Sequence, residues 1–183
     1  MNLFIDTHLN DVVVILSENN KIIKEKIILN EKQNSKIIMP TIKKLLNKKV
    51  PDSIIVVNGP GSFTGVRLGV TVAKTFAHTL QIPIKTVTSL ECLAVCTNEE
   101  EKIVAFSDKN GYYIGIFDKK INLVGKYEYL NNSQFNEFAK KHNVLLDIKI
   151  DYEKVISYAS LKKEINAHEV NPVYIKKIDV EKW

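Results

Sequence analysis

The chain has 183 residues, 45% of them hydrophobic, and a formal net charge of +5 at pH 7. This length and apolar content indicate one ordinary domain or two small lobes with a buried core, and exclude a fibrous or wholly disordered protein. No apolar run approaches about 18 residues and no basic, apolar leader precedes the first strand pattern, so we expect a cytoplasmic protein with no membrane partner.

The first half predicts three consecutive strands, and then helices alternating with strands. Short polar breaks separate the first three β-branched runs, which is typical of an antiparallel meander. Two later runs have helical spacing after Ser35 and Ser89, which we expect to cap them. The expected strands cover residues 2–6, 11–16, 21–29, 53–57 and 84–87, and the expected helices cover residues 35–46, 66–80 and 89–96.

The second half repeats this order after an acidic run at residues 98–101. We therefore predict an N-terminal lobe over residues 1–98 and a shortened C-terminal lobe over residues 99–183. Two tandem β-β-β-α lobes favour an α/β fold with mixed sheets, of the duplicated actin-like kind. The expected strands of the second half cover residues 102–107, 112–117 and 121–129, and its expected helices cover residues 133–142 and 158–164.

A glycine-rich turn joins the strand at 53–57 to the long helix, and residues 57–69 hold four of the seven glycines. We expect the glycines to permit unusual backbone conformations and close approach to the main chain. Unpaired amides at the start of the helix are suited to binding an anion or a carboxylate. The alternative is a turn shaped by backbone geometry alone. We expect Ser62 or Thr64 to cap the helix that follows the turn. The candidate site residues of this turn are Gly59, Gly61, Ser62, Thr64, Gly65 and Arg67.

Arg67 is the only arginine in the chain. We expect its planar guanidinium to hold a carboxylate or backbone carbonyls, or to reach a partner protein. The alternative is an exposed helix residue with a solvated head group. Since Val66 and Arg67 follow Gly65, the turn is not a P-loop, and it also lacks the third glycine of a dinucleotide-binding turn.

The helix at 66–80 is apolar around most of its circumference, which exceeds what one sheet face covers. It is either sandwiched within the fold or it forms an interface. We predict that it forms one partner surface with the helix at 35–46. The expected contact residues are Ile38, Thr41, Ile42, Leu45, Val70, Lys74, Ala77 and His78.

The chain shows no constellation typical of catalysis or metal binding. Its four histidines lie at least 26 residues apart, so none forms a ligand pair one helical turn apart. Cys92 and Cys96 are expected to be reduced thiols, and Asp6 is either a vestigial metal carboxylate or a turn residue. No glycine follows Gly125, so a complete nucleotide cleft is not expected. We predict no catalytic residue, no metal and no tightly bound cofactor, and weak nucleotide binding stays open.

The segment GPGSFTGVRLGVTVAKTFAHTLQIPIKTVTSLECLA resembles the signature region of the bacterial TsaB (YeaZ) family. LFIDT, IIMPTIKKLL and NPVYIKK fall where similar segments lie in that family. The resemblance is dense over residues 53–94 and weak over residues 127–170. Asn34 and Lys176 depart from the residues usual in the family, and the second lobe is short.

The resemblance implies an actin-like (ASKHA, ribonuclease H-like) subunit without catalysis of its own. Such a subunit binds and activates TsaD for threonylcarbamoyl transfer to the adenosine adjacent to the tRNA anticodon. It further implies a TsaE-like ATPase as a partner, and tRNA contact through the complex rather than by the chain alone. A homodimer of the free protein stays open. The alternatives are a small actin-like ATPase or kinase acting alone, and a glycoprotein-directed peptidase.

Overall fold

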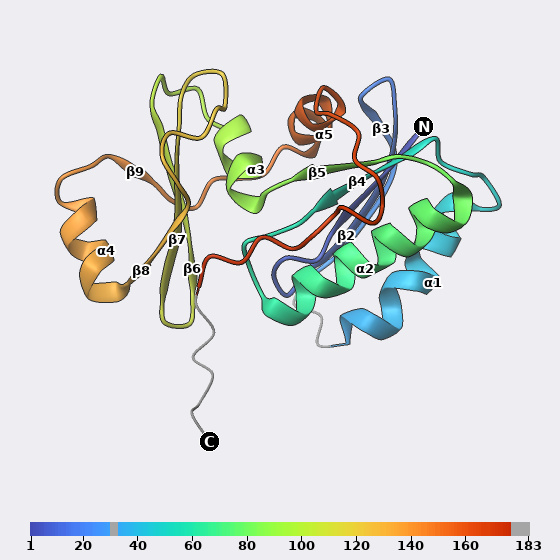
Figure 1. The fold of residues 1–183 in the computed structure, drawn as a ribbon, viewed down its shortest axis with the longest axis horizontal. Helices are drawn as coiled ribbons and strands as arrows, with labels where there is room; N and C mark the ends of the chain where they lie inside the picture. The colour runs from blue at the N-terminus through green and yellow to red at the C-terminus, as the bar shows by residue number, and fades with distance from the viewer. Residues whose placement is uncertain (30–32, 177–183) are drawn as a thin grey trace.

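Two mixed β-sheets stand side by side in the computed structural model, which describes residues 1–29 and 33–176 (Figure 1). The first sheet has the strand order β3-β2-β1-β4-β5, and the second has the order β8-β7-β6-β9. The strands of the first sheet are β1 (Asn2–Asp6), β2 (Val12–Glu18), β3 (Lys21–Ile28), β4 (Ser53–Val57) and β5 (Ile84–Val87). Those of the second are β6 (Lys102–Asp108), β7 (Gly111–Phe117), β8 (Glu128–Asn131) and β9 (Val144–Leu145).

Strand direction shows that the second sheet repeats the first. In the first sheet β2 is antiparallel to β1 and β3, whereas β4 is parallel to β1. In the second sheet β7 is antiparallel to β6 and β8, whereas β9 is parallel to β6. The two sheets therefore share one plan of three antiparallel strands followed by a parallel crossover. This confirms the predicted duplicated actin-like, ribonuclease H-like α/β fold.

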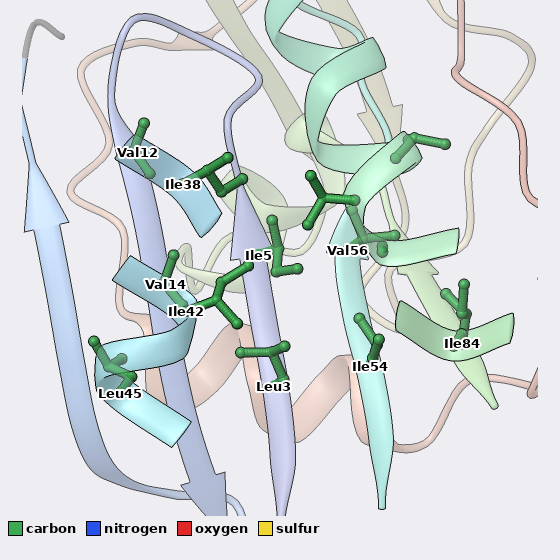
Figure 2. Close-up of a cluster of buried hydrophobic side chains, with 14 of the residues drawn as sticks. Leu3, Ile5, Val12, Val14, Ile38, Ile42, Leu45, Ile54, Val56 and Ile84 are labelled. Atoms are coloured by element: carbon green, nitrogen blue, oxygen red, sulfur yellow. The ribbon is translucent and has the colours of Figure 1, made fainter. Parts of the chain in front are cut away.

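Helices cover both faces of the first sheet. α1 (Asn34–Leu46) and α2 (Phe63–Leu80) pack on one face, over a core that Figure 2 shows. α5 (Tyr152–Ser160) covers the other face. Because both faces are covered, β2 is buried along almost its whole length. The core under α1 and α2 includes Leu3, Ile5, Val12, Val14, Ile38, Ile42, Leu45, Ile54, Val56 and Ile84.

α3 (Ser89–Val95) packs against the second sheet through Leu90 and Ala94. Its Cys92 belongs instead to the core under α5, so one short helix contributes to two cores. α4 (Asn132–Ala139) covers the far face of the second sheet, where Phe135 stacks on Tyr112 with ring centroids 3.7 Å apart.

The C-terminal described segment, residues 165–176, returns to the first sheet, and we call it the strap. Ile165 bridges to Ile84 at the edge of that sheet, and Val170 is buried in the core under α2. Further on, the Lys176 ammonium lies 3.4 Å from the Asp108 carboxylate of the second sheet. The strap thus contacts both halves, and the division at residue 98 stays a prediction.

The structure corrects several predicted element bounds. α1 begins at Asn34, so Ser35 lies inside the helix. The cap of α3 is Thr88, one residue before the expected cap Ser89, and the cap of α4 is Asn131, two residues before the expected start of that helix at residue 133. Other bounds moved further. The expected strand at 121–129 is mostly a loop, because Ile121 has a φ of 64°, and the last helix covers Tyr152–Ser160 instead of residues 158–164.

Candidate functional site

The glycine turn is packed against the backbone that follows β1. A Cβ atom on Gly61 would lie 2.2 Å from the carbonyl oxygen of His8, and one on Gly65 would lie 2.1 Å from that of Thr7. Of the three glycines at 59, 61 and 65, only Gly59 has a positive φ, of 101°. The expectation of unusual conformations therefore holds for Gly59 alone, and the other two glycines are needed for close approach.

Hydrogen bonds hold the turn in this position. The Ser62 N–H donates to the His8 carbonyl at 2.7 Å, and the Thr7 hydroxyl donates to the Gly65 carbonyl at 2.6 Å. Ser62 is the N-cap of α2, as predicted, since its hydroxyl accepts from the Gly65 N–H at 3.4 Å. Thr64 is an exposed residue of the first helical turn and not a cap.

Arg67 is held by aromatic residues. Its Nε donates to the Tyr174 hydroxyl at 2.7 Å, and its Cζ lies 3.5 Å from the centre of the Phe63 ring. The Phe63 and Tyr174 rings are themselves 5.3 Å apart. No carboxylate or carbonyl partner of Arg67 occurs among the residues that the structure describes, so only the expected contact with a partner protein stays a prediction. Tyr174 lies in the Asn-Pro-Val-Tyr element of the strap and was not among the predicted site residues.

A cleft of about 900 Å³ lies between the turn, the second sheet and the strap. Gly61, Ser62 and Phe63 line one side. Phe106, Asp108 and Tyr113 line the opposite side, and Tyr174 and Lys176 of the strap complete it. The turn thus lies at the boundary of this inter-sheet cleft, and Arg67 contacts two of the residues that line it, Phe63 and Tyr174.

Carboxylates in and beside the cleft have partners within the chain. Asp6 accepts from the backbone N–H of His8 at 3.0 Å and lies 2.6 Å from its ring Nδ1. Asp108 accepts from the Tyr129 hydroxyl at 2.7 Å and from the Asn110 N–H at 2.8 Å. Burial by itself raises the pKa of Asp108, but these hydrogen bonds and the Lys176 ammonium outweigh burial and hold the pKa below its ordinary value.

The predicted partner residues separate into two groups. Five are buried against the chain's own sheet and cannot contact a partner directly, which corrects their assignment; they are Ile38, Ile42, Leu45, Val70 and Ala77. Thr41 and Lys74 are half-buried, and His78 is exposed. The apolar circumference of α2 is covered by the sheet and by the strap, whose carbonyl at Val170 accepts from Lys74 at 2.9 Å. The two helices as a partner surface stay a prediction.

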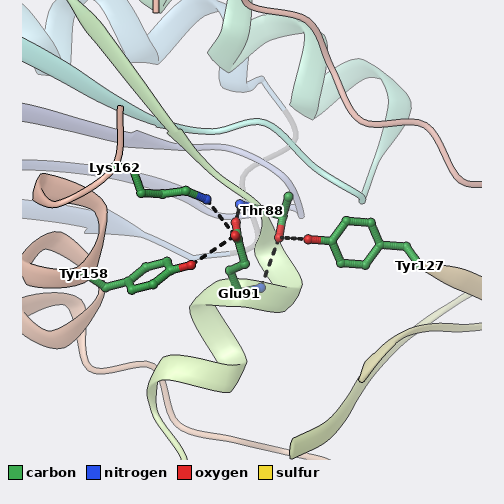
Figure 3. Close-up of polar contacts among 5 residues, drawn as sticks. All are labelled: Thr88, Glu91, Tyr127, Tyr158 and Lys162. Carbon is green, nitrogen blue, oxygen red and sulfur yellow. Dashed lines mark hydrogen bonds and ion pairs between the residues drawn. The ribbon is translucent and has the colours of Figure 1, made fainter. Parts of the chain in front are cut away.

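Glu91 of α3, which was not among the predicted site residues, forms a polar network (Figure 3). Its carboxylate accepts from the Thr88 N–H at 2.7 Å, from Lys162 at 2.6 Å and from the Tyr158 hydroxyl at 3.2 Å. The Thr88 hydroxyl lies 3.1 Å from that of Tyr127, whose pKa burial raises to about 12. A Thr-x-x-Glu capping box is the sequence signal that could have identified Thr88 and Glu91. The network joins α3, the end of α5 and the segment before β8.

Within the described ranges, no group of three or more His, Cys, Asp or Glu residues could hold a metal ion. Both cysteines are free, and burial raises the pKa of the Cys92 thiol well above its ordinary value. None of the described helices combines the length and apolar character that crossing a membrane requires.

The comparisons with known proteins agree with one another. The family model described as TsaD, tRNA N6-adenosine threonylcarbamoyltransferase, matches residues 21–169. The chain is 38% identical over 151 residues to the tRNA threonylcarbamoyladenosine biosynthesis protein TsaB of Bacillus subtilis, covering 79% of this chain and 62% of that protein. It is 30% identical over 142 residues to the TsaB protein of Buchnera aphidicola, covering 75% and 60%. The chain thus spans about three fifths of the length of these relatives.

Solved structures show the same fold. A Pseudomonas aeruginosa protein described as similar to the peptidase YeaZ superposes with a TM-score of 0.78 at 19% identity, over 96% of this chain and 99% of that chain. YeaZ from the same organism gives a TM-score of 0.76 at 20% identity, over 95% and 99%. The chain therefore belongs to the family that the TsaD model describes, and within it to the TsaB (YeaZ) proteins.

Proposed function

We propose that the chain is a subunit of the machinery that makes threonylcarbamoyladenosine in tRNA, and that it acts by binding and activating a TsaD-like catalytic subunit. The observation that carries the proposal is the 38% identity to a TsaB protein over 151 residues. The densest part of the resemblance, residues 53–94, includes the glycine turn and α2. A TsaE-like ATPase and tRNA are further partners in this proposal, with tRNA bound through the complex.

The contact in this proposal is the α1–α2 face, by which we mean the exposed and half-exposed side chains of α1, α2 and residues 47–49. α1 and α2 pack over the same face of the first sheet (Figure 1). The buried residues under them hold the two helices in fixed positions. The face therefore offers a rigid surface, which reduces the entropy lost when a partner binds.

The chain is proposed to perform no transfer chemistry itself. The two acids Asp6 and Asp108, which lie at the ends of corresponding strands β1 and β6, are hydrogen-bonded to His8, Asn110 and Tyr129. These contacts support structural roles for both carboxylates. The second candidate function is an actin-like ATPase or kinase, which the inter-sheet cleft of about 900 Å³ favours. Weak nucleotide binding there belongs to the same candidate.

Reconstitution tests the proposal. The chain is combined with purified TsaD-like and TsaE-like subunits and tRNA, and the modified nucleoside is measured by mass spectrometry. We expect product only when the chain is present, and no ATP hydrolysis by the chain alone. Product that forms equally well without the chain contradicts an activating role, and ATP hydrolysis by the highly purified chain favours the second candidate.

A surface variant tests the place of contact. Thr75→Glu puts a charge at an exposed position of α2, and Asn136→Glu puts the same charge at an exposed position of α4. We expect only Thr75→Glu to weaken partner binding. Ala77→Glu is unsuitable, because Ala77 is 2% exposed and its substitution would test folding.

A further inference from the structure

Two histidines that are far apart in the sequence, His78 of α2 and His168 of the strap, meet where the strap runs beside the helix (Figure 1). Their ring centroids are 5.1 Å apart, and the ring planes cross at 65°. Both residues are exposed, and neither ring has a hydrogen-bond partner in the part of the chain that the structure describes. A neutral imidazole has one ring nitrogen with a lone pair, so both rings can bind a ligand there.

The spacing of the two rings fits one metal ion between them. Zinc binds a histidine nitrogen at about 2.0–2.1 Å, and the ring centre lies about 1.1 Å behind that nitrogen. Two imidazoles at the tetrahedral angle therefore place their ring centres about 5.2 Å apart. The observed 5.1 Å agrees with this value. Because both side chains are exposed, each ring can turn a nitrogen toward the common point without disturbing the core.

The two rings line a polar hollow of about 480 Å³ at the end of α2. Gln81, Glu164 and Asn166 line the same hollow and bring side-chain oxygen atoms to it. His78 lies in the last turn of α2, where the helix dipole places partial negative charge. This end of the helix therefore favours a cation.

Two ammonium groups near the hollow are directed to oxygen atoms of the chain. Lys74 donates to the strap carbonyls of Val170 at 2.9 Å and His168 at 3.4 Å. Lys85 donates to the Ser160 carbonyl at 2.7 Å and lies 3.8 Å from the Glu164 carboxylate. The contacts of Lys74 also hold the strap against α2, so the two rings are close together before an ion binds. Such preorganisation reduces the entropy lost on binding.

We propose that His78 and His168 form a binding site for one transition-metal dication of the class that imidazole prefers, such as Zn²⁺, Ni²⁺ or Cu²⁺. Water completes the coordination, since the described residues hold no group of three or more His, Cys, Asp or Glu that could bind the ion alone. The ion clasps the strap to the end of α2. This inference goes beyond the proposed function and does not depend on it.

Metal titration of the full chain, free of any histidine tag, tests the site. Zn²⁺ binding at neutral pH is measured by isothermal titration calorimetry for the parent, for His78→Gln and for His168→Gln. The matched control is His142→Gln, which removes an exposed histidine that stacks on Phe138 instead. A second titration uses Mg²⁺. Circular dichroism checks folding, and hydrogen exchange of residues 165–170 is compared with and without Zn²⁺.

We expect the parent to bind one Zn²⁺ per chain and no Mg²⁺, because Mg²⁺ prefers oxygen ligands. Each variant of the pair should fold normally and bind Zn²⁺ about tenfold more weakly or worse, whereas the control should keep the affinity of the parent. Zn²⁺ should slow hydrogen exchange in residues 165–170 of the parent and of the control, but not in the two variants, because only a bridging ion restrains the strap.

Several results would overturn the inference. They include a parent that binds no Zn²⁺, a His168→Gln variant with the affinity of the parent, and a control that loses as much affinity as the variants. Zn²⁺ that binds the parent without slowing exchange in residues 165–170 would show an ion held outside the strap, and would overturn the clasp. The proposed function is tested separately by reconstitution and stands or falls on that result.

Discussion

Replacement of Glu91 by alanine should destabilise the fold by about 3 kcal/mol. Breaking a buried ion pair by removing one partner costs about 3–5 kcal/mol. The Lys162 side chain keeps 29% of its surface exposed, so water can solvate the unpaired ammonium and we reduce this part to about 2 kcal/mol. The loss of the acceptor for the Thr88 N–H removes half of a capping box, which contributes about 1 kcal/mol more.

Urea unfolding of the purified chain measures this effect. With a slope of about 2 kcal/mol per molar urea, the midpoint of Glu91→Ala should fall by roughly 1.5 M. Glu91→Gln should lose about half as much, because its amide oxygen can still accept from the Thr88 N–H. Glu169→Ala, which removes an exposed carboxylate from the strap, is the control and should leave the midpoint unchanged. A Glu91→Ala midpoint equal to that of the control would refute the network as a source of stability.

Three further variants test other contacts. Gly65→Ala should destabilise the fold by about 3 kcal/mol, because its Cβ would meet the Thr7 carbonyl oxygen at 2.1 Å; an unchanged melting temperature would contradict this. Arg67→Lys should weaken the partner complex more than tenfold, or about 1.4 kcal/mol, since lysine loses the planar contact with Phe63, while the isolated chain stays folded; equal affinity would contradict it. The pKa of Asp108 in the folded chain lies below its ordinary value. The ionised carboxylate therefore stabilises the fold at a pH above the ordinary pKa, and this stabilisation is lost as the pH falls through the folded-state pKa. As the pH falls below about 4, the free energy of unfolding of Asp108→Asn should therefore decrease less than that of the parent. Urea titrations that give the same pH dependence for the variant and the parent would contradict this role.

Much of the secondary structure could be predicted because its signals are local. The strands Asn2–Asp6, Ser53–Val57 and Ile84–Val87 coincide with their predicted ranges. In each of them a short apolar run is bounded by residues that end strands. The recurrence of three strands and a helix likewise predicted the duplicated fold. Local sequence failed at Ile121, where a left-handed residue and the turn around Asp118 interrupt a strand-like run.

The candidate site could be predicted only in part. The sequence by itself determined the glycine turn and the Ser62 cap, and it singled out Arg67 as the only arginine, whose role stays a prediction. The tertiary structure decided what these residues contact: Tyr174, 107 residues from Arg67, accepts its hydrogen bond, and Lys162 pairs with Glu91 across 71 residues. Helical periodicity identified apolar faces on α1 and α2, yet it could not show that the sheet and the strap cover them. The physical reason is that periodicity records which side chains share a face, whereas burial depends on which distant segment packs there.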